Sequence, residues 1–335
     1  MAKNPSWILQ SYPPGMPTVD NWRLEDRPIP ETANGQLLVK TIWLSVDPYM
    51  RARISQAKNY ASGFSLGDLM TGGGVGEVIS SDSPDFKPGD IVMSDYFGWQ
   101  PFTTVPASSA KIVTNKDAPV QASLSYLGDN GLTAYFALLR TGNPKEGETV
   151  LISAASGSVG QIAGQIARIK GLDPVAVVGT DAKVEWCKEI GYREGINHRT
   201  STDLVADVAA ACPNGIDIFI DHTAGPIHDA AMFNLNKFGR VVIVGTISRA
   251  DRFDEPDIGL RHLRRILITR ARIEGFLLND FESEYETAMA DLLSWYKQGL
   301  LKTREDVVEG IEAVPYAFIR MLKGENFGKQ LVRLP

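Results

Sequence analysis

One stretch of the chain, Ile152–Lys170 (ISAASGSVGQIAGQIARIK), limits the possible folds more than any other. The apolar run Thr149–Ser153 leads into a glycine-containing turn, and from Val159 onward apolar residues recur at helical spacing. Gly157 lets the chain turn tightly, and Gly160 lets the helix approach the strand or a bound pyrophosphate. The turn reads Ala-x-Gly-x-x-Gly, with Ala155 in place of the usual first glycine. This strand, turn and helix predict a dinucleotide site in which backbone N–H groups face the diphosphate.

The alternation of strand and helix continues along the chain. A second helix is expected at Ala182–Ile190, and further short strands are expected at Val175–Val178, Ile196–His198, Ile216–Asp221, Arg240–Thr246 and Ala271–Phe276. Strand, helix and strand in repetition are typical of a doubly wound parallel sheet. The sequence therefore predicts an α/β domain over residues 123–304.

The first third of the chain has a different character. Short strand-like runs at Gln36–Val46, Thr71–Ser80 and Ile91–Ser94 are separated by Pro and Gly, which is typical of an irregular β domain. Strand and turn character returns from about Glu305. We expect residues 1–122 to form this β domain and residues 305–335 to fold back onto it.

Composition excludes several classes of protein. A net charge of −6 argues against nucleic-acid binding, which requires a basic face. No apolar run is long enough to span a bilayer, and the start of the chain lacks a signal-peptide core, so we expect no membrane association. Cys187 and Cys212 stand in unrelated contexts, which favours a reducing compartment and a cytoplasmic protein. The two cysteines and four histidines lack ligand spacing, so no metal site is predicted.

The residues after the second predicted strand bear on the choice of nicotinamide cofactor. Asp181 stands near the position where an acidic residue binds the ribose hydroxyls in NAD enzymes. Lys183, two residues later, can neutralise a 2′-phosphate, and Arg199 is a second candidate cation. Asp181 can equally be a helix-capping residue, and Lys183 a solvated lysine. These residues alone favour NADPH only slightly.

Six stretches together resemble a known family. They are Leu44–Arg51 (LSVDPYMR), Gly72–Val78 (GGGVGEV), Gly131–Phe136 (GLTAYF), Ala154–Gly160 (AASGSVG), Ile273–Phe276 (IEGF) and Glu325–Leu331 (ENFGKQL). In this order they resemble the zinc-independent medium-chain dehydrogenase/reductases of the prostaglandin reductase and curcumin reductase group, also called alkenal/one oxidoreductases. The resemblance implies a GroES-like substrate domain, a Rossmann domain, NADPH as cofactor and a homodimer.

The resemblance also implies roles for individual residues. Lys183 is assigned to the adenosine phosphate, and Gly157, Ser158, Val159 and Gly160 to the pyrophosphate. Further residues are expected to line the cofactor, with the later ones near the nicotinamide: Val244, Gly245, Thr246, Ile247, Ser248, Thr133, Phe276, Leu277, Leu278 and Asn326.

Four departures from the family pattern stand out. His198 replaces a tyrosine beside the phosphate, and a histidine can still donate a hydrogen bond there. His222, in DHTAG, replaces an asparagine that usually contacts the cofactor. Asp129 and Asn130 make the approach to the GLTAYF helix more polar than usual. Ala250 occupies the place of a tyrosine associated with the substrate carbonyl, which leaves the substrate class open.

The expected reaction is hydride transfer to the β carbon of an α,β-unsaturated ketone or aldehyde. Charge then develops on the carbonyl oxygen, which needs hydrogen-bond donors rather than a strong base or a metal. Tyr49 and Tyr60 are the candidate catalytic donors, with a cofactor ribose hydroxyl as the alternative. Either tyrosine can instead be a packing residue. Arg51 and Arg53 can bind an anionic substrate, although loop arginines are more often solvated or paired.

Two other functions remain open at this stage. A quinone reductase of the same superfamily shares the fold and the cofactor and differs in its acceptor. An NADPH-binding protein without turnover is the second alternative, and Ala250 leaves room for it.

Overall fold

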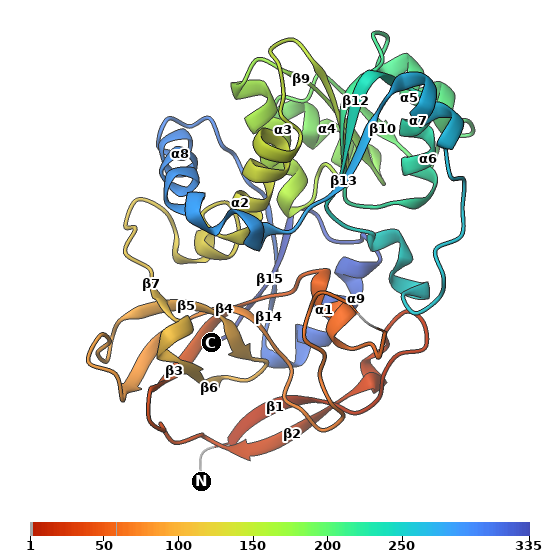
Figure 1. Ribbon diagram of the computed structural model, residues 1–335. Helices are drawn as coiled ribbons and strands as arrows, with labels where there is room; N and C mark the ends of the chain where they lie inside the picture. Colours follow the sequence, from red (N-terminus) through yellow and green to blue (C-terminus); the bar gives the residue numbers. More distant parts are fainter. Residues whose placement is uncertain (1–2, 58) are drawn as a thin grey trace. The chain divides into compact units, whose positions relative to one another are not determined.

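The computed structural model describes residues 3–57 and 59–335 of the chain (Figure 1). The chain divides into two compact units. The first contains the residues up to Leu124 together with Ala250–Glu255 and Glu305–Pro335. The second contains Ser125–Arg249 and Pro256–Arg304. The segment Ala250–Glu255 therefore groups with residues far from it in sequence.

The first unit is built on β structure. A hairpin pairs β1 (Lys3–Leu9) with β2 (Trp22–Pro28). A seven-stranded sheet has the order β14-β15-β3-β4-β5-β7, with β6 paired to β3. Its strands are β3 (Gln36–Ser45), β4 (Thr71–Ser81), β5 (Ile91–Gly98), β6 (Phe102–Pro106), β7 (Lys111–Ile112), β14 (Glu305–Glu309) and β15 (Lys329–Arg333). Two helices accompany these strands, α1 (Tyr49–Arg53) and α9 (Val314–Leu322).

The glycine run in β4 has a packing reason. A Cβ atom on Gly74 would lie 2.3 Å from Cγ of Phe97, a fully buried ring on β5. A Cβ atom on Gly76 would lie 2.3 Å from the carbonyl oxygen of Lys40 on β3. Only glycine allows the neighbouring strands and their side chains to approach this closely.

The second unit is a six-stranded sheet in the order β10-β9-β8-β11-β12-β13, and every strand pair is parallel. The strands are β8 (Thr149–Ser153), β9 (Asp173–Val178), β10 (Glu194–Asn197), β11 (Ile216–Asp221), β12 (Leu235–Ile243) and β13 (Arg272–Gly275). The order reverses between β8 and β11. In open parallel sheets, ligands bind at the carboxyl ends of the strands beside such a reversal.

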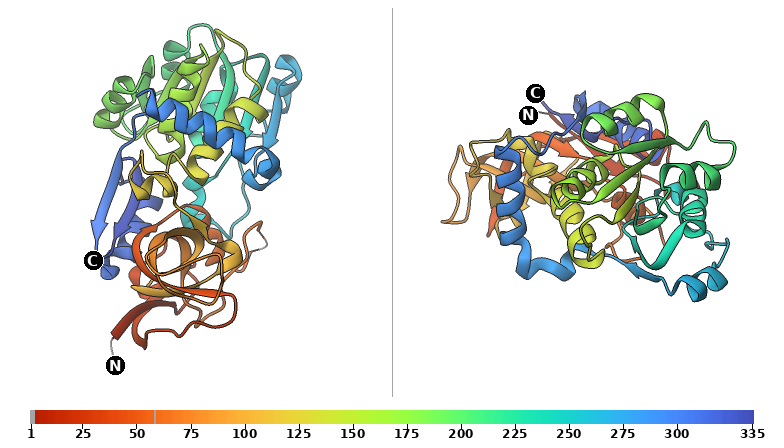
Figure 2. Two further views of the ribbon diagram at one scale, coloured as in Figure 1. Left: turned by 90° about the vertical axis from the view of Figure 1, so that its left-hand side faces the viewer. Right: turned by 90° about the horizontal axis from the view of Figure 1, so that it is seen from above.

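Helices cover this sheet in two groups. In the first, α2 (Asp129–Phe136) packs against both α3 (Ser158–Ile169) and α8 (Tyr285–Lys297), the blue helix in front in the left view of Figure 2. In the second, α5 (Leu204–Ala211) packs against α6 (Gly225–Phe233). The remaining helices are α4 (Asp181–Glu189) and α7 (Leu263–Thr269). Residues of one sheet face, such as Leu151 and Phe219, form a buried core with α5 and α6.

The fold class expected from the sequence, an irregular β domain and a doubly wound parallel sheet, is confirmed. The expected strands at Thr149–Ser153 and Ile216–Asp221 match β8 and β11 residue for residue. The strand expected at Arg240–Thr246 is wrong at both ends, because β12 spans Leu235–Ile243. Its first half holds polar residues, a positive φ of 63° at Phe238 and an irregular register against β11, so it lacks the strand pattern.

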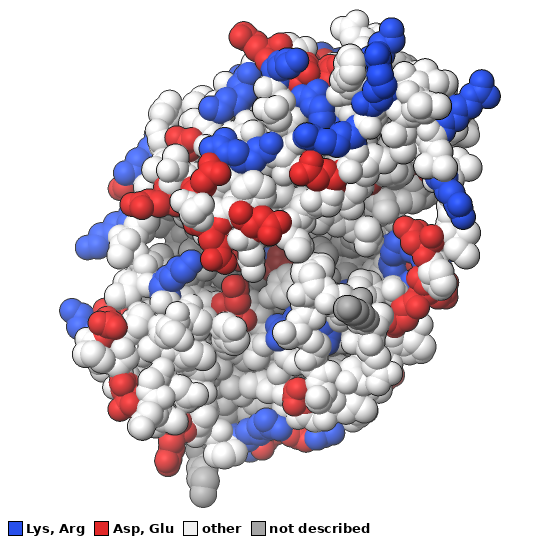
Figure 3. Space-filling view, viewed as in Figure 1, with Lys and Arg blue, Asp and Glu red and all other residues white. Residues whose placement is uncertain are grey.

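Two further observations concern the whole described chain. No helix in it combines the length and the apolar character needed to cross a membrane. On the face shown in Figure 3, acidic and basic side chains lie among one another.

Candidate functional site

The glycine turn lies at the carboxyl end of β8, beside the reversal of strand order. Ala154 is left-handed (φ 49°), and its carbonyl accepts a 2.8 Å hydrogen bond from the N–H of Gly157, which precedes α3. A Cβ atom on Gly160 would lie 2.6 Å from the carbonyl oxygen of Ala154 and from Cα of Ala155. Gly160 is therefore required by the close contact of α3 with its own turn. The first N–H groups of α3 have no intrahelical acceptor, as at any helix start, so they can bind an anion.

Ser158, the first residue of α3, is linked to α2. Its Oγ donates a 2.8 Å hydrogen bond to Oδ1 of Asn130. Asp129 and Asn130, the polar departure noted in the sequence, form the start of α2. Asn130 thus orients the hydroxyl of the first residue of α3. Thr133 lies one turn further along α2.

Basic side chains gather where β9 and β10 end. Lys183 is buried in the first turn of α4, and Thr180 caps that helix by accepting from the N–H of Lys183. A Cβ atom on Gly179 would lie 3.2 Å from Nε of Arg199 and 3.4 Å from Nε2 of His198. Burial, and then the charges of Arg199 and Lys183, lower the pKa of His198. This group of Lys183, His198 and Arg199, called the cation cluster below, can bind a dianionic phosphate.

Asp181 has a local structural role. It is the first residue of α4, and Oδ1 accepts a 2.7 Å hydrogen bond from Nδ2 of Asn197 at the end of β10. A carboxylate in the first turn also suits the positive end of the helix dipole. Thr180 rather than Asp181 is the capping residue.

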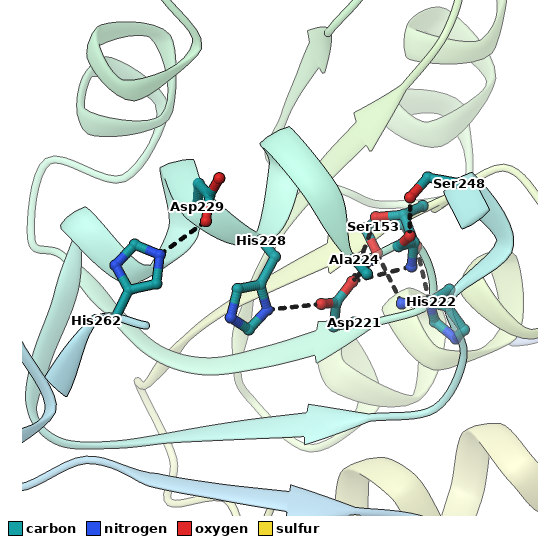
Figure 4. A network of polar contacts seen from close by, with 9 residues as sticks. Ser153, Asp221, His222, Ala224, His228, Asp229, Ser248 and His262 are labelled. Atoms are coloured by element: carbon teal, nitrogen blue, oxygen red, sulfur yellow. Dashed lines mark hydrogen bonds and ion pairs between the residues drawn. The ribbon is translucent and has the colours of Figure 1, made fainter. Parts of the chain in front are cut away.

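A buried carboxylate organises the other side of the reversal point, at the end of β11 (Figure 4). Asp221 is fully buried. Its Oδ1 accepts from the N–H groups of Thr223 and Ala224 at 2.9 Å each and from Oγ of Ser153 at 3.2 Å. Its Oδ2 accepts from Nδ1 of His228 at 2.9 Å. Burial alone would raise the pKa of Asp221, but these hydrogen bonds hold it below its ordinary value.

The segment His222–Gly225, called the Asp221 turn below, is strained. Ala224 has φ 60° and ψ −159°, a region that is normally reserved for glycine and costs about 1–3 kcal/mol. The hydrogen bonds to Asp221 offset this cost, because they fix the backbone N–H groups of the turn.

His222 spans the reversal point. Its N–H donates to Oγ of Ser153 and its Nδ1 lies 2.8 Å from the carbonyl oxygen of Ser153, both at the end of β8. Because a carbonyl can only accept, Nδ1 carries the hydrogen and Nε2 is an acceptor. Nε2 is shielded from solvent and has no hydrogen-bond partner among residues 3–57 and 59–335. Burial lowers the pKa of this imidazole, so the neutral ring is the favoured form.

The residues after β12 are attached to the Asp221 turn. The N–H groups of Val244 and Gly245 both donate to the carbonyl oxygen of Asp221. Ile247 donates to the carbonyl of His222, and Ser248 donates to the carbonyl of Thr223 through both its N–H and its Oγ. Val244–Ser248, including Thr246, therefore follows the conformation of the turn.

The remaining expected residues of the second unit lie beyond β13. Phe276 is buried, its ring stacks on Phe281 with centroids 5.6 Å apart, and its N–H donates to the carbonyl of Ile243. Leu277 is exposed, and Leu278 begins a short 3₁₀ helix. The segment thus combines one packed ring with two residues whose side chains are less enclosed.

The expected residues of the first unit are Tyr49, Tyr60 and Asn326. Tyr49 is the first residue of α1 and is partly buried. Tyr60 is 68% exposed as a residue, and partial burial of its phenol group raises the pKa of that group. Asn326 donates through Nδ2 to the carbonyl of Gly328 at 2.8 Å, and its amide also has a second N–H donor and an acceptor oxygen.

Arg51 is neither solvated nor open to the surface. Its side chain is 2% exposed, and Nε donates a 2.9 Å hydrogen bond to the carbonyl of Ala250. Oγ of Ser55 bonds to Asp254, so two residues of the α1 region hold the segment Ala250–Glu255. Arg53 donates to the carbonyl of Thr71 at 2.9 Å. Both arginines are thus used in structure within the first unit.

The sequence did not reveal Asp221, Ser153 and His228 as parts of the site. The available signal was an aspartate directly after a buried strand, at the edge where ligands bind. Within the described residues, no group of three or more His, Cys, Asp or Glu side chains is placed to hold a metal ion.

Comparison with known proteins identifies the family. Residues 5–113 match a family described as the N-terminal domain of oxidoreductase, and residues 158–295 match one described as zinc-binding dehydrogenase. The NADPH-dependent curcumin reductase of Escherichia coli (strain K12) is 36% identical over 99% of this chain and 97% of its own length. Prostaglandin reductase 1 of Mus musculus is 35% identical over 99% of this chain and 100% of its own length. The crystal structure of CurA in complex with NADPH from Vibrio vulnificus superimposes with a TM-score of 0.93 at 36% identity, covering 99% of both chains.

The chain belongs to the prostaglandin reductase and curcumin reductase group of medium-chain dehydrogenase/reductases. The resemblance found in the six sequence stretches is confirmed. This member carries His198, His222 and Ala250 at the three positions where the sequence departs most from the expected pattern.

Proposed function

We propose that the protein uses NADPH to reduce the carbon–carbon double bond of α,β-unsaturated ketones and aldehydes. The observation that carries the proposal is the cation cluster at the end of β9 and β10, in a chain similar over its whole length to reductases of this kind. The names of its relatives include curcumin reductase, prostaglandin reductase and NADP-dependent 2-alkenal reductase. A dinucleotide on this sheet would place its adenosine ribose beside the end of the second strand, where a 2′-phosphate meets the cluster.

The residues present fit a dinucleotide. The N–H groups at the start of α3 offer donors to the diphosphate, with Gly157, Ser158, Val159 and Gly160 forming the turn. The cation cluster offers charge to the 2′-phosphate. Nε2 of His222 is a buried acceptor without a donor, and a ligand hydroxyl or amide N–H would satisfy it. We assign to the rest of the cofactor Thr133, Val244, Gly245, Thr246, Ile247, Ser248, Phe276, Leu277, Leu278 and Asn326.

NADPH, when bound, supplies a hydride, and the β carbon of the acceptor receives it. The task of the protein is then to hold the two reactants in line and to stabilise charge on the acceptor's carbonyl oxygen. We assign the hydrogen bond to that oxygen to the phenol groups of Tyr49 and Tyr60. Tyr49 begins α1, and Tyr60 follows that helix in sequence and is largely exposed.

Steady-state oxidation of NADPH and NADH against enones, enals and quinones tests the proposal. We expect NADPH to be oxidised with enones and enals and to be preferred over NADH. Faster turnover with quinones would identify a quinone reductase instead. Tight NADPH binding without turnover on any acceptor would identify a binding protein.

Tyr49→Phe tests the assigned donor. We expect turnover on an enone to fall by about 100-fold, the scale for loss of one donor to a developing oxyanion, with the Kd for NADPH unchanged. Tyr60→Phe is the matched comparison. If neither substitution changes turnover, the donor is the cofactor ribose and not a tyrosine.

We propose further that the protein is a homodimer formed through β13. Within the described chain, β13 pairs only with β12, so its outer edge is unpaired and all four of its residues are exposed. Leu263, Leu267 and Ile268 of α7 and Ile273 of β13 add exposed apolar surface. An unpaired strand edge beside exposed leucines is typical of a surface that another chain covers. Light scattering after gel filtration should give twice the mass of 36.6 kDa, and Leu267→Glu should give the monomer mass.

We propose that the protein acts in the cytoplasm. Cys187 and Cys212 are both free and buried, and burial raises each thiol pKa to about 12. Two unpaired cysteines suit a reducing compartment. Fractionation of cells that produce the protein tests this assignment.

A further inference from the structure

Two histidine–aspartate pairs lie next to each other along α6, and the proposed function uses neither histidine (Figure 4). Nδ1 of His228 lies 2.9 Å from Oδ2 of Asp221, and Nε2 of His262 lies 2.7 Å from Oδ1 of Asp229. The two imidazole rings are 5.9 Å apart. The two carboxylates differ in exposure: Asp221 is fully buried, whereas the Asp229 side chain is 36% exposed.

Asp221 connects His228 to the segments that we assign to the dinucleotide. One carboxylate oxygen receives the N–H groups of the Asp221 turn, and the other receives His228. The backbone carbonyl of Asp221 holds Val244 and Gly245. A change in the charge or position of the carboxylate is therefore transmitted both to His222 and to the loop after β12.

His228 supplies positive charge to this carboxylate when it is protonated. The groups that face His228 are Asp221 and the Phe219 ring from β11, the neighbouring Asp229, and His262 and Asp257 from the chain before α7. The hydrogen bond to Asp221 raises the pKa of His228, against the effect of burial, and Asp229 and Asp257 act in the same direction. Its side chain is 20% exposed, so it can exchange its proton with solvent.

The neutral ring can still donate from Nδ1 but no longer compensates the buried charge. The Asp221 turn contains a strained Ala224, so its conformation depends on a fully bound carboxylate. Loss of the proton should weaken the turn without unfolding the protein.

We propose that His228 is a positioning residue that couples one proton to dinucleotide binding: protonated His228 fixes Asp221, and Asp221 fixes the turn and loop that receive the cofactor. This inference rests on the proposed function, because it assigns the Asp221 turn to NADPH. The bound protein then holds the His228 proton more tightly than the free protein does. By linkage, affinity is highest below the raised pKa of His228 in the free protein, and it declines as the pH rises from that pKa to the still higher pKa in the bound protein.

The test is the Kd of NADPH for the full chain, measured by calorimetry between pH 6.5 and 9. The 2′-phosphate, with a second pKa of about 6, is dianionic over most of this range, and the lowered pKa of His198 keeps that ring neutral. We expect the Kd of the wild-type protein to rise by about threefold to tenfold across the range. His228→Gln, which keeps a donor and removes the titrating charge, should give a flat profile, and His262→Gln should keep the wild-type slope.

Parallel profiles for the wild-type protein and His228→Gln would overturn the inference and leave the proposed function intact. Absence of NADPH binding at every pH would overturn both. If His228→Gln does not fold, the wild-type protein supplies a second measurement. With four histidines in the chain, NMR can follow each imidazole, and the pKa of His228 must be higher with NADPH than without it. An unchanged pKa would contradict the coupling.

Discussion

At the ends of β9 and β10, Lys183 and Arg199 place positive charge beside His198, whereas at the end of β11 a single buried carboxylate, Asp221, gathers donors. Burial, and then the charges of Arg199 and Lys183, lower the pKa of His198, so the first group places two cations beside a neutral ring. The second is self-contained, since both oxygens of Asp221 are bonded within the protein.

The difference shows that two sites at one edge of a sheet can have different roles in ligand binding. Like charges brought together favour a bound anion, and so they select a ligand by charge. A buried carboxylate with its donors in place favours one backbone conformation and so selects a shape. We expect substitutions in the cation cluster to change cofactor choice, and substitutions around Asp221 to change stability first.

The largest expected effect is that of Asp221→Ala on stability. The substitution removes the acceptor of two turn N–H groups and leaves His228 without its partner, so we expect the free energy of unfolding to fall by about 3–5 kcal/mol. Urea unfolding at pH 7 measures it. Asp229→Ala, next to His228 on α6, is the control: the Asp229 carboxylate is partly exposed, so its loss should cost about 1 kcal/mol or less. Equal losses of unfolding free energy in the two variants would show that Asp221 contributes no more to stability than Asp229 does.

The next effect is that of Lys183→Ala on cofactor choice. Loss of the buried cation that we assign to the 2′-phosphate should raise the Kd for NADPH by about 10- to 100-fold, equivalent to about 1.4–2.7 kcal/mol, and leave the Kd for NADH almost unchanged. Lys188→Ala is the matched control, because Lys188 lies on the same helix and pairs with Glu194 at 2.7 Å. Similar losses for NADPH and NADH would show that Lys183 does not bind the 2′-phosphate.

The two regions also differ in how far the sequence predicts them. The strand, turn and helix from Thr149 to Lys170 are predictable because their signals are local. The distance past the next strand singles out Asp181 and Lys183 together, and only the family resemblance assigns the phosphate to Lys183. The Asp221 network joins residues 153, 221 and 228 through tertiary contacts, and no local pattern encodes that meeting. The same holds for Ala250–Glu255, which lies inside the α/β stretch but is held by Arg51 and Ser55.

Gly160→Ala tests the turn after β8, the strand that lies between the two regions in the sheet. The new Cβ would lie 2.6 Å from two backbone atoms that cannot move independently, so α3 must shift away from its turn. Overpacking of this kind lowers the free energy of unfolding by about 1–3 kcal/mol. The displaced start of α3 should also weaken the binding of NADPH and of NADH by the same factor. Gly259→Ala is the control, since a Cβ there meets nothing within 4 Å. A loss of affinity for NADPH but not for NADH would contradict this role of Gly160.

The smallest expected effect is the pH dependence of stability, to which His222 and His228 contribute with opposite signs. Burial lowers the pKa of His222, so below pH 6.5 the unfolded chain takes up a proton that the folded protein refuses, and stability falls as the pH falls. The pKa of His228 is raised, so its contribution is fully present below pH 6.5 and is lost as the pH rises through the raised value.

The stabilities of His222→Asn and His228→Gln should therefore change in opposite directions as the pH falls. Relative to the wild-type protein, His222→Asn should become more stable as the pH falls from 8 to 5, because it removes the group that resists protonation. Over the same range His228→Gln should become less stable, because it removes the group that gains from protonation. Each change should be about 1 kcal/mol or less, and urea unfolding at four pH values resolves the signs. Changes of the same sign in both variants would mean that Asp221 and its two histidines titrate as one unit, and that charge, more than shape, governs this end of the sheet as well.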